Sequence, residues 1–129
     1  MRFGYTIVYV ADVAASLDFF ERGFGLKRRF LHESGGYGEL DTGSTTLSFA
    51  QHETARGNLG RGYVAADVSD EPLGMEIGLL TQDVAAACAR AVAAGATLLK
   101  PPTVKPWGQT VAYVRCPDGS LVELCTPMG

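Results

Sequence analysis

The sequence predicts an α+β domain made of two tandem copies of one βαβββ unit. The segment Asp12-Val13-Ala14-Ala15 recurs as Asp83-Val84-Ala85-Ala86, and 83 − 12 gives an offset of 71 residues. Each copy opens a helical pattern that lies between segments with the alternation and β-branched content of strands. A Gly-Ser turn precedes the last strand-like segment of each half, at Gly43 and at Gly119. A repeat of this period constrains the architecture more tightly than any single element does.

Length and composition limit the class of protein. The chain has 129 residues, enough for one domain with a substantial core. Apolar residues make up 47% and charged residues 19%, which favours a globular fold over disorder. The net charge is −3 and no basic stripe is present, so we expect neither nucleic acid nor an anionic membrane as a partner. No apolar segment of signal-peptide or membrane-spanning type is found.

The cysteine content bears on the compartment. Cys88, Cys116 and Cys125 are an odd number of thiols without metal-type spacing. The simplest interpretation is a reduced, cytoplasmic protein with buried thiols. Cys116 has no histidine near it in sequence to activate it, so a structural role is favoured over a nucleophilic one.

The first half of the chain reads β-α-β-β-β. The segment 5–10 is rich in β-branched and aromatic residues and predicts a strand. Asp12 predicts a helix N-cap, apolar residues then recur at helical spacing, and Gly25 predicts the helix end. Three further strands are predicted, and they are 26–31, 37–40 and 45–50.

The second half repeats this order after a connector. We place the first module at about residues 1–51, the connector at about 52–74 and the second module at about 75–129. Glycines and prolines punctuate the connector, so it is predicted to be irregular, with at best a short strand at 63–66. The second module is predicted to consist of a strand at 76–80, a helix from Val84 to Gly95, and strands at 96–100, 109–115 and 121–125.

Strand alternation separates a helix-facing set from an inward set. The helix-facing set is almost wholly apolar, as a buried face must be, and consists of Val8, Val10, Leu47, Phe49, Ile77, Leu79, Val122 and Leu124. The offset makes Tyr5 equivalent to Glu76, and the aligned last strands make Ser48 equivalent to Glu123. We expect the two sheets to curl together, helices outside, so that these four positions surround one central cavity. Glu123 lies between Leu121 and Cys125, where a carboxylate is costly without water, a cation or a hydrogen-bond donor.

The quoted motifs resemble the vicinal oxygen chelate superfamily, which includes glyoxalase I, bleomycin-resistance proteins and extradiol dioxygenases. The resemblance rests on residues 10–20, the internal repeat, the loop Pro106-Trp107-Gly108-Gln109 and the segment 117–124. It covers essentially the whole chain. It implies a curved mixed sheet of two βαβββ modules around a cavity, and it implies a homodimer.

The resemblance also implies where a metal would be held. Family enzymes bind a divalent ion through one inward residue of four strands, usually His or Gln, Glu, His and Glu. Here those positions carry Tyr5, Ser48, Glu76 and Glu123, of which Glu123 alone matches the usual type. The chain therefore looks more like the metal-free, bleomycin-resistance-like branch. We expect no cofactor, and a weakly held divalent metal is left open.

The candidate ligand-binding residues follow from the inward set. Tyr5, Tyr9 and Tyr113 are expected to form an aromatic wall, although Tyr113 shares a strand face with Val111 and fits the core equally well. Trp107 lies in the loop at the expected cavity rim, where it stacks on a planar or cationic ligand or simply anchors the loop. The full set is Tyr5, Tyr9, Ser48, Glu76, Trp107, Tyr113, Glu123 and Cys125.

Two functions follow from different classes. In the first, the protein binds a small, partly aromatic or cationic drug or metabolite without a metal. In the second, it is a glyoxalase-like lyase, isomerase or epimerase that uses Glu76 and Glu123 as acid and base or as weak metal ligands. If the two carboxylates approach each other, like charge and burial raise one pKa. A third reading, a structural role with the cavity filled by side chains, has little support in the sequence.

Overall fold

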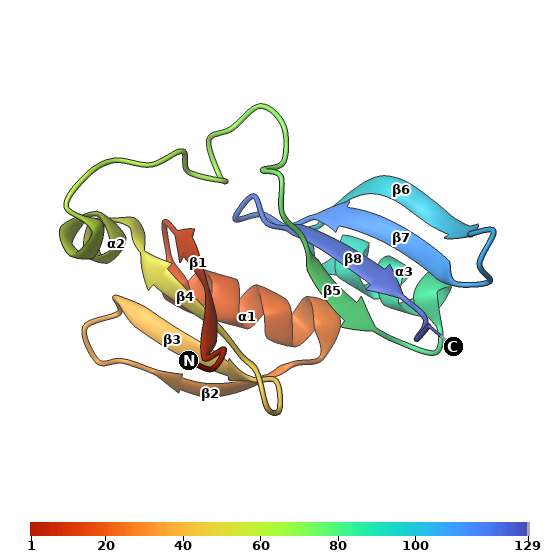
Figure 1. Ribbon diagram of the computed structural model, residues 1–129, viewed down its shortest axis with the longest axis horizontal. Coiled ribbons are helices and arrows are strands. Elements are labelled where there is room, and N and C mark those ends of the chain that lie inside the picture. The colour runs from red at the N-terminus through yellow and green to blue at the C-terminus, as the bar shows by residue number, and fades with distance from the viewer. Residues whose placement is uncertain (129) are drawn as a thin grey trace.

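The computed structural model describes residues 1–128, which form two four-stranded sheets and three helices (Figure 1). Gly129, the last residue of the predicted second module, lies outside the described residues. The strands of the first sheet are β1 (Tyr5–Val10), β2 (Lys27–Leu31), β3 (Tyr37–Asp41) and β4 (Thr46–Gln51). Those of the second sheet are β5 (Ile77–Leu80), β6 (Thr97–Val104), β7 (Thr110–Arg115) and β8 (Leu121–Cys125). The helices are α1 (Val13–Phe24), α2 (His52–Leu59) and α3 (Val84–Ala94).

The two sheets have the same topology, which confirms the predicted repeat. Their strand orders are β1-β4-β3-β2 and β5-β8-β7-β6, with the first pair in each sheet parallel and the others antiparallel. The register repeats as well, because Ile7 pairs with Ser48 and Gly78 pairs with Glu123, and 78 − 7 is again 71. The two sheets are separate and do not close into a barrel.

Both long helices begin and end at the residues that the sequence marks. Asp12 Oδ1 accepts a hydrogen bond from the backbone N–H of Ala15 at 3.1 Å, and Asp83 Oδ1 accepts one from Ala86 at 3.0 Å. Each bond satisfies one of the free N–H groups of a first helical turn. Gly25 ends α1 with a φ of 71°, a left-handed conformation that suits glycine.

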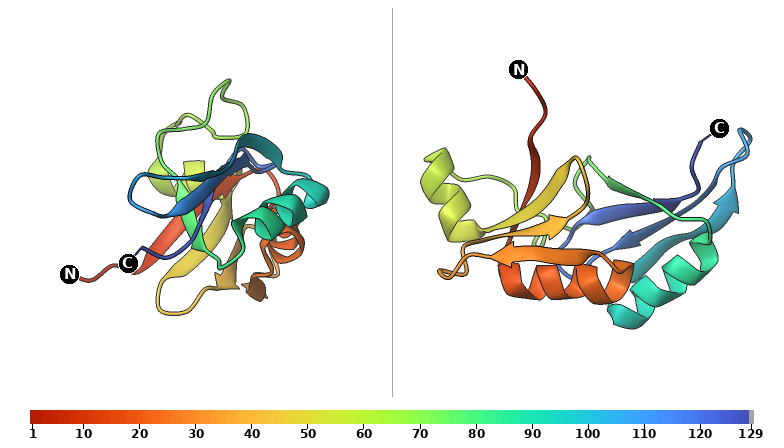
Figure 2. Two further views of the ribbon diagram at one scale, coloured as in Figure 1. Left: turned by 90° about the vertical axis from the view of Figure 1, so that its right-hand side faces the viewer. Right: turned by 90° about the horizontal axis from the view of Figure 1, so that it is seen from below.

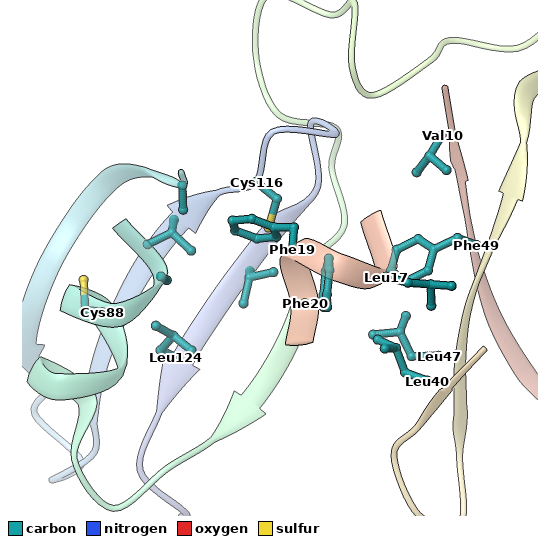
Figure 3. Close-up of a cluster of buried hydrophobic side chains, with 14 of the residues drawn as sticks. Val10, Leu17, Phe19, Phe20, Leu40, Leu47, Phe49, Cys88, Cys116 and Leu124 are labelled. Carbon is teal, nitrogen blue, oxygen red and sulfur yellow. The ribbon is translucent and has the colours of Figure 1, made fainter. Parts of the chain in front are cut away.

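The core lies between the helices and one face of each sheet. The helix-facing residues predicted from alternation are buried there or pack against its edge. Phe20 packs on Phe49 at a ring-centroid distance of 5.1 Å, while Phe19 extends from α1 toward Cys116 of the second module (Figure 3). Helices α1 and α3 pack against each other and join the modules. Both helices therefore cover the same side of the molecule, and the opposite faces of the sheets are left open (Figure 2).

The connector departs from the prediction in containing helix α2 and no strand at 63–66. This helix is polar apart from the buried Ala55, so hydrophobic periodicity gives no signal for it. The helix is held instead by contacts with residues later in the chain. His52 Nδ1 is hydrogen-bonded to the Tyr63 hydroxyl, and its Nε2 lies 3.2 Å from Asp67 Oδ1. The helix is therefore stabilised only when the connector folds back over it.

Arg115 holds the rest of the connector against the second module. Its Nη2 donates to the carbonyl oxygens of Ala66 at 2.8 Å and Ser69 at 2.9 Å, and its Nη1 donates to that of Asp70 at 3.3 Å. Gly119 lies so close to this chain that a Cβ there would overlap the Ala66 carbonyl. The connector is therefore a fixed wall, although residues 60–76 contain no helix or strand.

Strand β6 is longer than predicted, because it continues through Pro101 and Pro102 to Val104. Proline lacks the N–H of a ladder bond, but β6 is an edge strand with one side free of a partner. Register shifts against β7 accompany the prolines. None of the helices within residues 1–128 has the length and apolar character needed to span a bilayer.

Candidate ligand-binding site

The open face of the second sheet carries a tyrosine–glutamate pair. Tyr113 of β7 and Glu123 of β8 are paired residues on antiparallel strands, so their side chains stand on the same face. The Tyr113 hydroxyl donates to Glu123 Oε2 at 2.9 Å. This hydrogen bond, followed by burial, raises the pKa of Tyr113 to about 12. Tyr113 is thus a protonated donor at neutral pH. Its strand neighbours Ala112 and Val114 belong to the buried hydrophobic core and Tyr113 does not. Tyr113 therefore lies on the open face, and its alternative placement in the core is wrong.

Glu76 joins this pair from the residue before β5. Burial, followed by the charge of Glu123, raises the pKa of Glu76. Gly78, the partner of Glu123 on β5, has no side chain, and a Cβ placed there would lie 3.9 Å from Glu123 Oε1. Neither carboxylate forms an ion pair with any residue from 1 to 128. The open face of the second sheet therefore holds two carboxyl groups that have no cationic partner among residues 1–128.

Cys125 lies on the same face but is buried. Its Sγ donates to the Leu79 carbonyl at 3.9 Å. Burial, followed by the charge of Glu123, raises the pKa of the Cys125 thiol. Burial likewise raises the pKa of Cys116. Both thiols stay protonated at neutral pH, which agrees with structural and lining roles and not with nucleophiles.

The open face of the first sheet holds a second tyrosine–glutamate pair, which the sequence analysis missed. Glu39 of β3 is opposite Ser48 and is only 8% exposed. The Tyr37 hydroxyl donates to Glu39 Oε2 at 2.7 Å, and Arg29 Nη1 lies 3.5 Å from Glu39 Oε1. This carboxylate is therefore neutralised, in contrast to those of the second sheet. The sequence does hold a signal for this pair, because Glu39 is next to the core residue Leu40 on a strand and must therefore point to the opposite, open face.

A β-bulge brings Arg29 to Glu39. The register between β2 and β3 shifts between Arg28 and Phe30, so Arg29 is the extra residue. Bulges commonly redirect one side chain relative to its neighbours. Because the shift depends on the pairing of two strands, the run of three basic residues did not reveal which one would meet Glu39.

The remaining predicted site residues are spread over the molecule. Ser48 is fully buried, and its hydroxyl donates to the Thr6 carbonyl at 3.3 Å. Tyr9 packs on Tyr63 with ring centroids 4.8 Å apart. Trp107 is exposed at the β6–β7 turn, and its Nε1 donates to Gln109 Oε1 at 3.0 Å.

The four predicted inward residues fall into two groups, one on each sheet. Tyr5 on β1 and Ser48 on β4 belong to the first sheet, whereas Glu76 lies near Glu123 on the second. Within residues 1–128, no cluster of three or more His, Cys, Asp or Glu side chains is arranged to hold a metal ion. The donor set is a phenol, a buried serine and two carboxylates. It does not fit the divalent metal that the resemblance implies.

Comparison with known proteins agrees with the fold. Residues 2–124 match the Glyoxalase/Bleomycin resistance protein/Dioxygenase superfamily. The chain belongs to this superfamily. No curated protein matches it.

Solved structures with the same fold include proteins from several bacteria. The chain is 24% identical to a glyoxalase-related enzyme from Fulvimarina pelagi, with a TM-score of 0.83 over 98% of this chain and 88% of that one. It is 23% identical to a glyoxalase/bleomycin resistance protein/dioxygenase family enzyme from Burkholderia phytofirmans PsJN, with a TM-score of 0.78 over 95% of each chain. TioX from Micromonospora sp. ML1 is 23% identical, with a TM-score of 0.68 over 98% of each chain. At these identities the likeness shows the fold alone.

Proposed function

We propose that this protein binds a small organic cation, a drug or a metabolite, in the manner of the bleomycin-resistance branch and without a metal. The observation that carries the proposal is the pair Glu76 and Glu123, which stands on an open face and has no cationic partner among residues 1–128. A charged ligand would supply the missing partner, and an ion pair with the half-buried Glu123 is stronger than one in water. Tyr113 beside the pair offers an aromatic surface for the same ligand.

We further propose that the working unit is a homodimer in the cytoplasm. Side chains on the open faces of β1 and β5 are exposed although they are apolar or aromatic, and they include Tyr5 at 60%, Ile7 at 44% and Leu80 at 67%. A second copy of the chain placed on these faces would cover them and would bring the two tyrosine–glutamate pairs to one cavity. Three free, buried cysteines favour a reducing compartment.

The test of the binding proposal is a screen of organic cations against the purified full chain, read as thermal stabilisation. A ligand that binds the folded state raises its unfolding temperature, and the rise grows with the logarithm of the ligand concentration above its Kd. Glu123→Gln should abolish the shift, whereas Glu39→Gln, at a carboxylate already paired with Arg29, should leave most of it. Detection of one tightly held divalent ion per chain would overturn the metal-free proposal. Equal losses in the two variants would overturn the assignment of the site.

A lyase, isomerase or epimerase is the second candidate. The observation in its favour is that Glu76 and Glu123 have different surroundings, since Tyr113 donates to Glu123 while burial raises the pKa of Glu76. Acid and base are commonly assigned to carboxylates that differ in this way. Glu123→Gln separates the candidates, because an enzyme would bind its substrate and lose turnover, whereas a binding protein shows no turnover to lose.

A further inference from the structure

One row of paired residues crosses the open face of the second sheet from edge to edge. Gly78 of β5 is paired with Glu123 of β8, and Glu123 is paired with Tyr113 of β7. Tyr113 is paired in turn with Lys100 of the edge strand β6. Residues directly opposite each other on paired strands place their side chains on the same face of the sheet. These four residues form the cross-sheet row, which follows the strand order β5-β8-β7-β6 (Figure 1).

The row carries a carboxylate on β8 and an ammonium group on β6. Lys100 is exposed, and neither Lys100 nor Glu123 forms an ion pair with any residue from 1 to 128. Neighbouring strands lie about 4.8 Å apart, so the backbones of these two residues are separated by about 10 Å. Tyr113 stands between them, and its hydroxyl donates to Glu123. Opposite charges therefore lie on the two sides of an aromatic ring.

The carboxylate end of the row has room for a cationic group. Gly78 has no side chain, and a Cβ built there would have Glu123 Oε1, at 3.9 Å, as its one contact within 4 Å beyond its chain neighbours. Glu76, two residues before Gly78, adds a second carboxyl group, and the charge of Glu123 contributes to its raised pKa. This end is therefore both open and acidic.

The first sheet provides an internal comparison, because the repeat places an equivalent row there. That row consists of Ile7, Ser48, Glu39 and Phe30. It has an isoleucine at the position of Gly78 and a phenylalanine at the position of Lys100. The extra residue of the β2 bulge is Arg29, which neutralises Glu39, whereas the extra residue at the matching bulge of β6 is Leu99. The fold therefore does not itself require opposite charges at these positions.

We propose that the ligand is a zwitterion, with its cationic group at Glu123 and an anionic group at Lys100. The part of the ligand that joins the two groups lies against the ring of Tyr113. This inference rests on the proposed cation-binding function and adds to it the second charge of the ligand. A ligand with a cationic group alone would leave the Lys100 charge unpaired and would be repelled by it.

The experiment compares three probes of similar size by ligand-observed NMR titration of the full chain, namely 4-(aminomethyl)benzoic acid, benzylamine and benzoic acid. At neutral pH the first is a zwitterion, the second a cation and the third an anion. The zwitterion should bind roughly three- to fivefold more tightly than benzylamine, which is the gain from one exposed ion pair. Added salt should reduce this advantage. Benzoic acid should bind most weakly, because Glu123 repels its carboxylate.

Two substitutions at Lys100 test the assignment of the anionic group. Lys100→Met should remove the advantage of the zwitterion over benzylamine, and Lys100→Glu should reverse it. The matched control is Lys27→Met, because Lys27 is also an exposed lysine on an edge strand, β2 of the first sheet. This control should leave all three titrations unchanged. The unfolding temperatures of the variants verify that each one is folded.

The failure of this inference is distinguishable from the failure of the proposed function. An advantage of the zwitterion that persists in Lys100→Met, or its absence in the unmodified chain, would overturn the inference. If benzylamine still binds and is weakened by Glu123→Gln, the proposed function stands. If Glu123→Gln weakens neither ammonium probe, both proposals are overturned.

Discussion

Replacement of Arg115 by methionine should loosen the connector and weaken the fold. The guanidinium makes its two shortest hydrogen bonds to Ala66 and Ser69, at 2.8 and 2.9 Å. A hydrogen bond to a charged group contributes about 1.5 kcal/mol or more when buried, and less when its acceptor can turn to water. Two such bonds on a half-buried side chain predict a loss of about 2–3 kcal/mol in the free energy of unfolding.

The control for this prediction is Arg22→Met. Arg22 is an exposed arginine that pairs with Asp18 at 2.8 Å within α1, where such pairs contribute less than about 1 kcal/mol. Urea unfolding gives the stability of both variants, and hydrogen exchange followed by mass spectrometry gives the protection of residues 64–72. Arg115→Met alone should expose those amides. Equal stability losses in the two variants, or unchanged protection of 64–72, would refute the reasoning.

Three further predictions concern single side chains. Ser120→Ala should not lower the unfolding free energy, since the Ser120 hydroxyl has no hydrogen-bond partner among residues 1–128. Ser16→Ala should lower it by about 1 kcal/mol, because the Ser16 hydroxyl donates to Asp118 at 2.8 Å. Calorimetry of both variants checks this. The raised pKa of Tyr113 gives stability that is present below pH 10 and lost as the pH rises through about 12. Tyr113→Phe should remove the last step of the tyrosinate absorbance titration and flatten the alkaline loss, and an unchanged titration would contradict it. Asp83→Ala removes the N-cap of α3 and should cost about 1 kcal/mol, with Asp83→Asn recovering most of it in chemical denaturation.

The agreement between the sequence and the fold is closest where neighbouring residues decide the structure. The caps Asp12 and Asp83 bond within their own first helical turns, and Gly25 ends α1 through its own φ. Strand faces follow from the period of two, so the helix-facing set was found by alternation alone. The internal repeat made the strand faces of one module apply to the other, and the equivalent pairs Ile7 with Ser48 and Gly78 with Glu123 agree with this.

The prediction missed features that depend on partners distant in sequence. Helix α2 lacks an apolar stripe, and its contacts to Tyr63 and Asp67 arise only when the connector folds back over it. The buried Glu39 was overlooked because its neutralising partner, Arg29, is placed by a bulge between two strands. Neither contact has a periodic pattern in the sequence.

The sequence by itself determined two βαβββ units, their core faces and the inward carboxylates, because local dihedral preferences and side-chain periodicity act within each unit. Tertiary structure alone decided which carboxyl groups have a cationic partner and where a pocket forms between the two modules. The physical reason is that neutralisation depends on which residues the strand pairing brings together, and cavity shape depends on how the two units pack. Strand register and the bulge at Arg29 decide the pairing within the first unit, and the packing of α1 on α3 decides how the units meet.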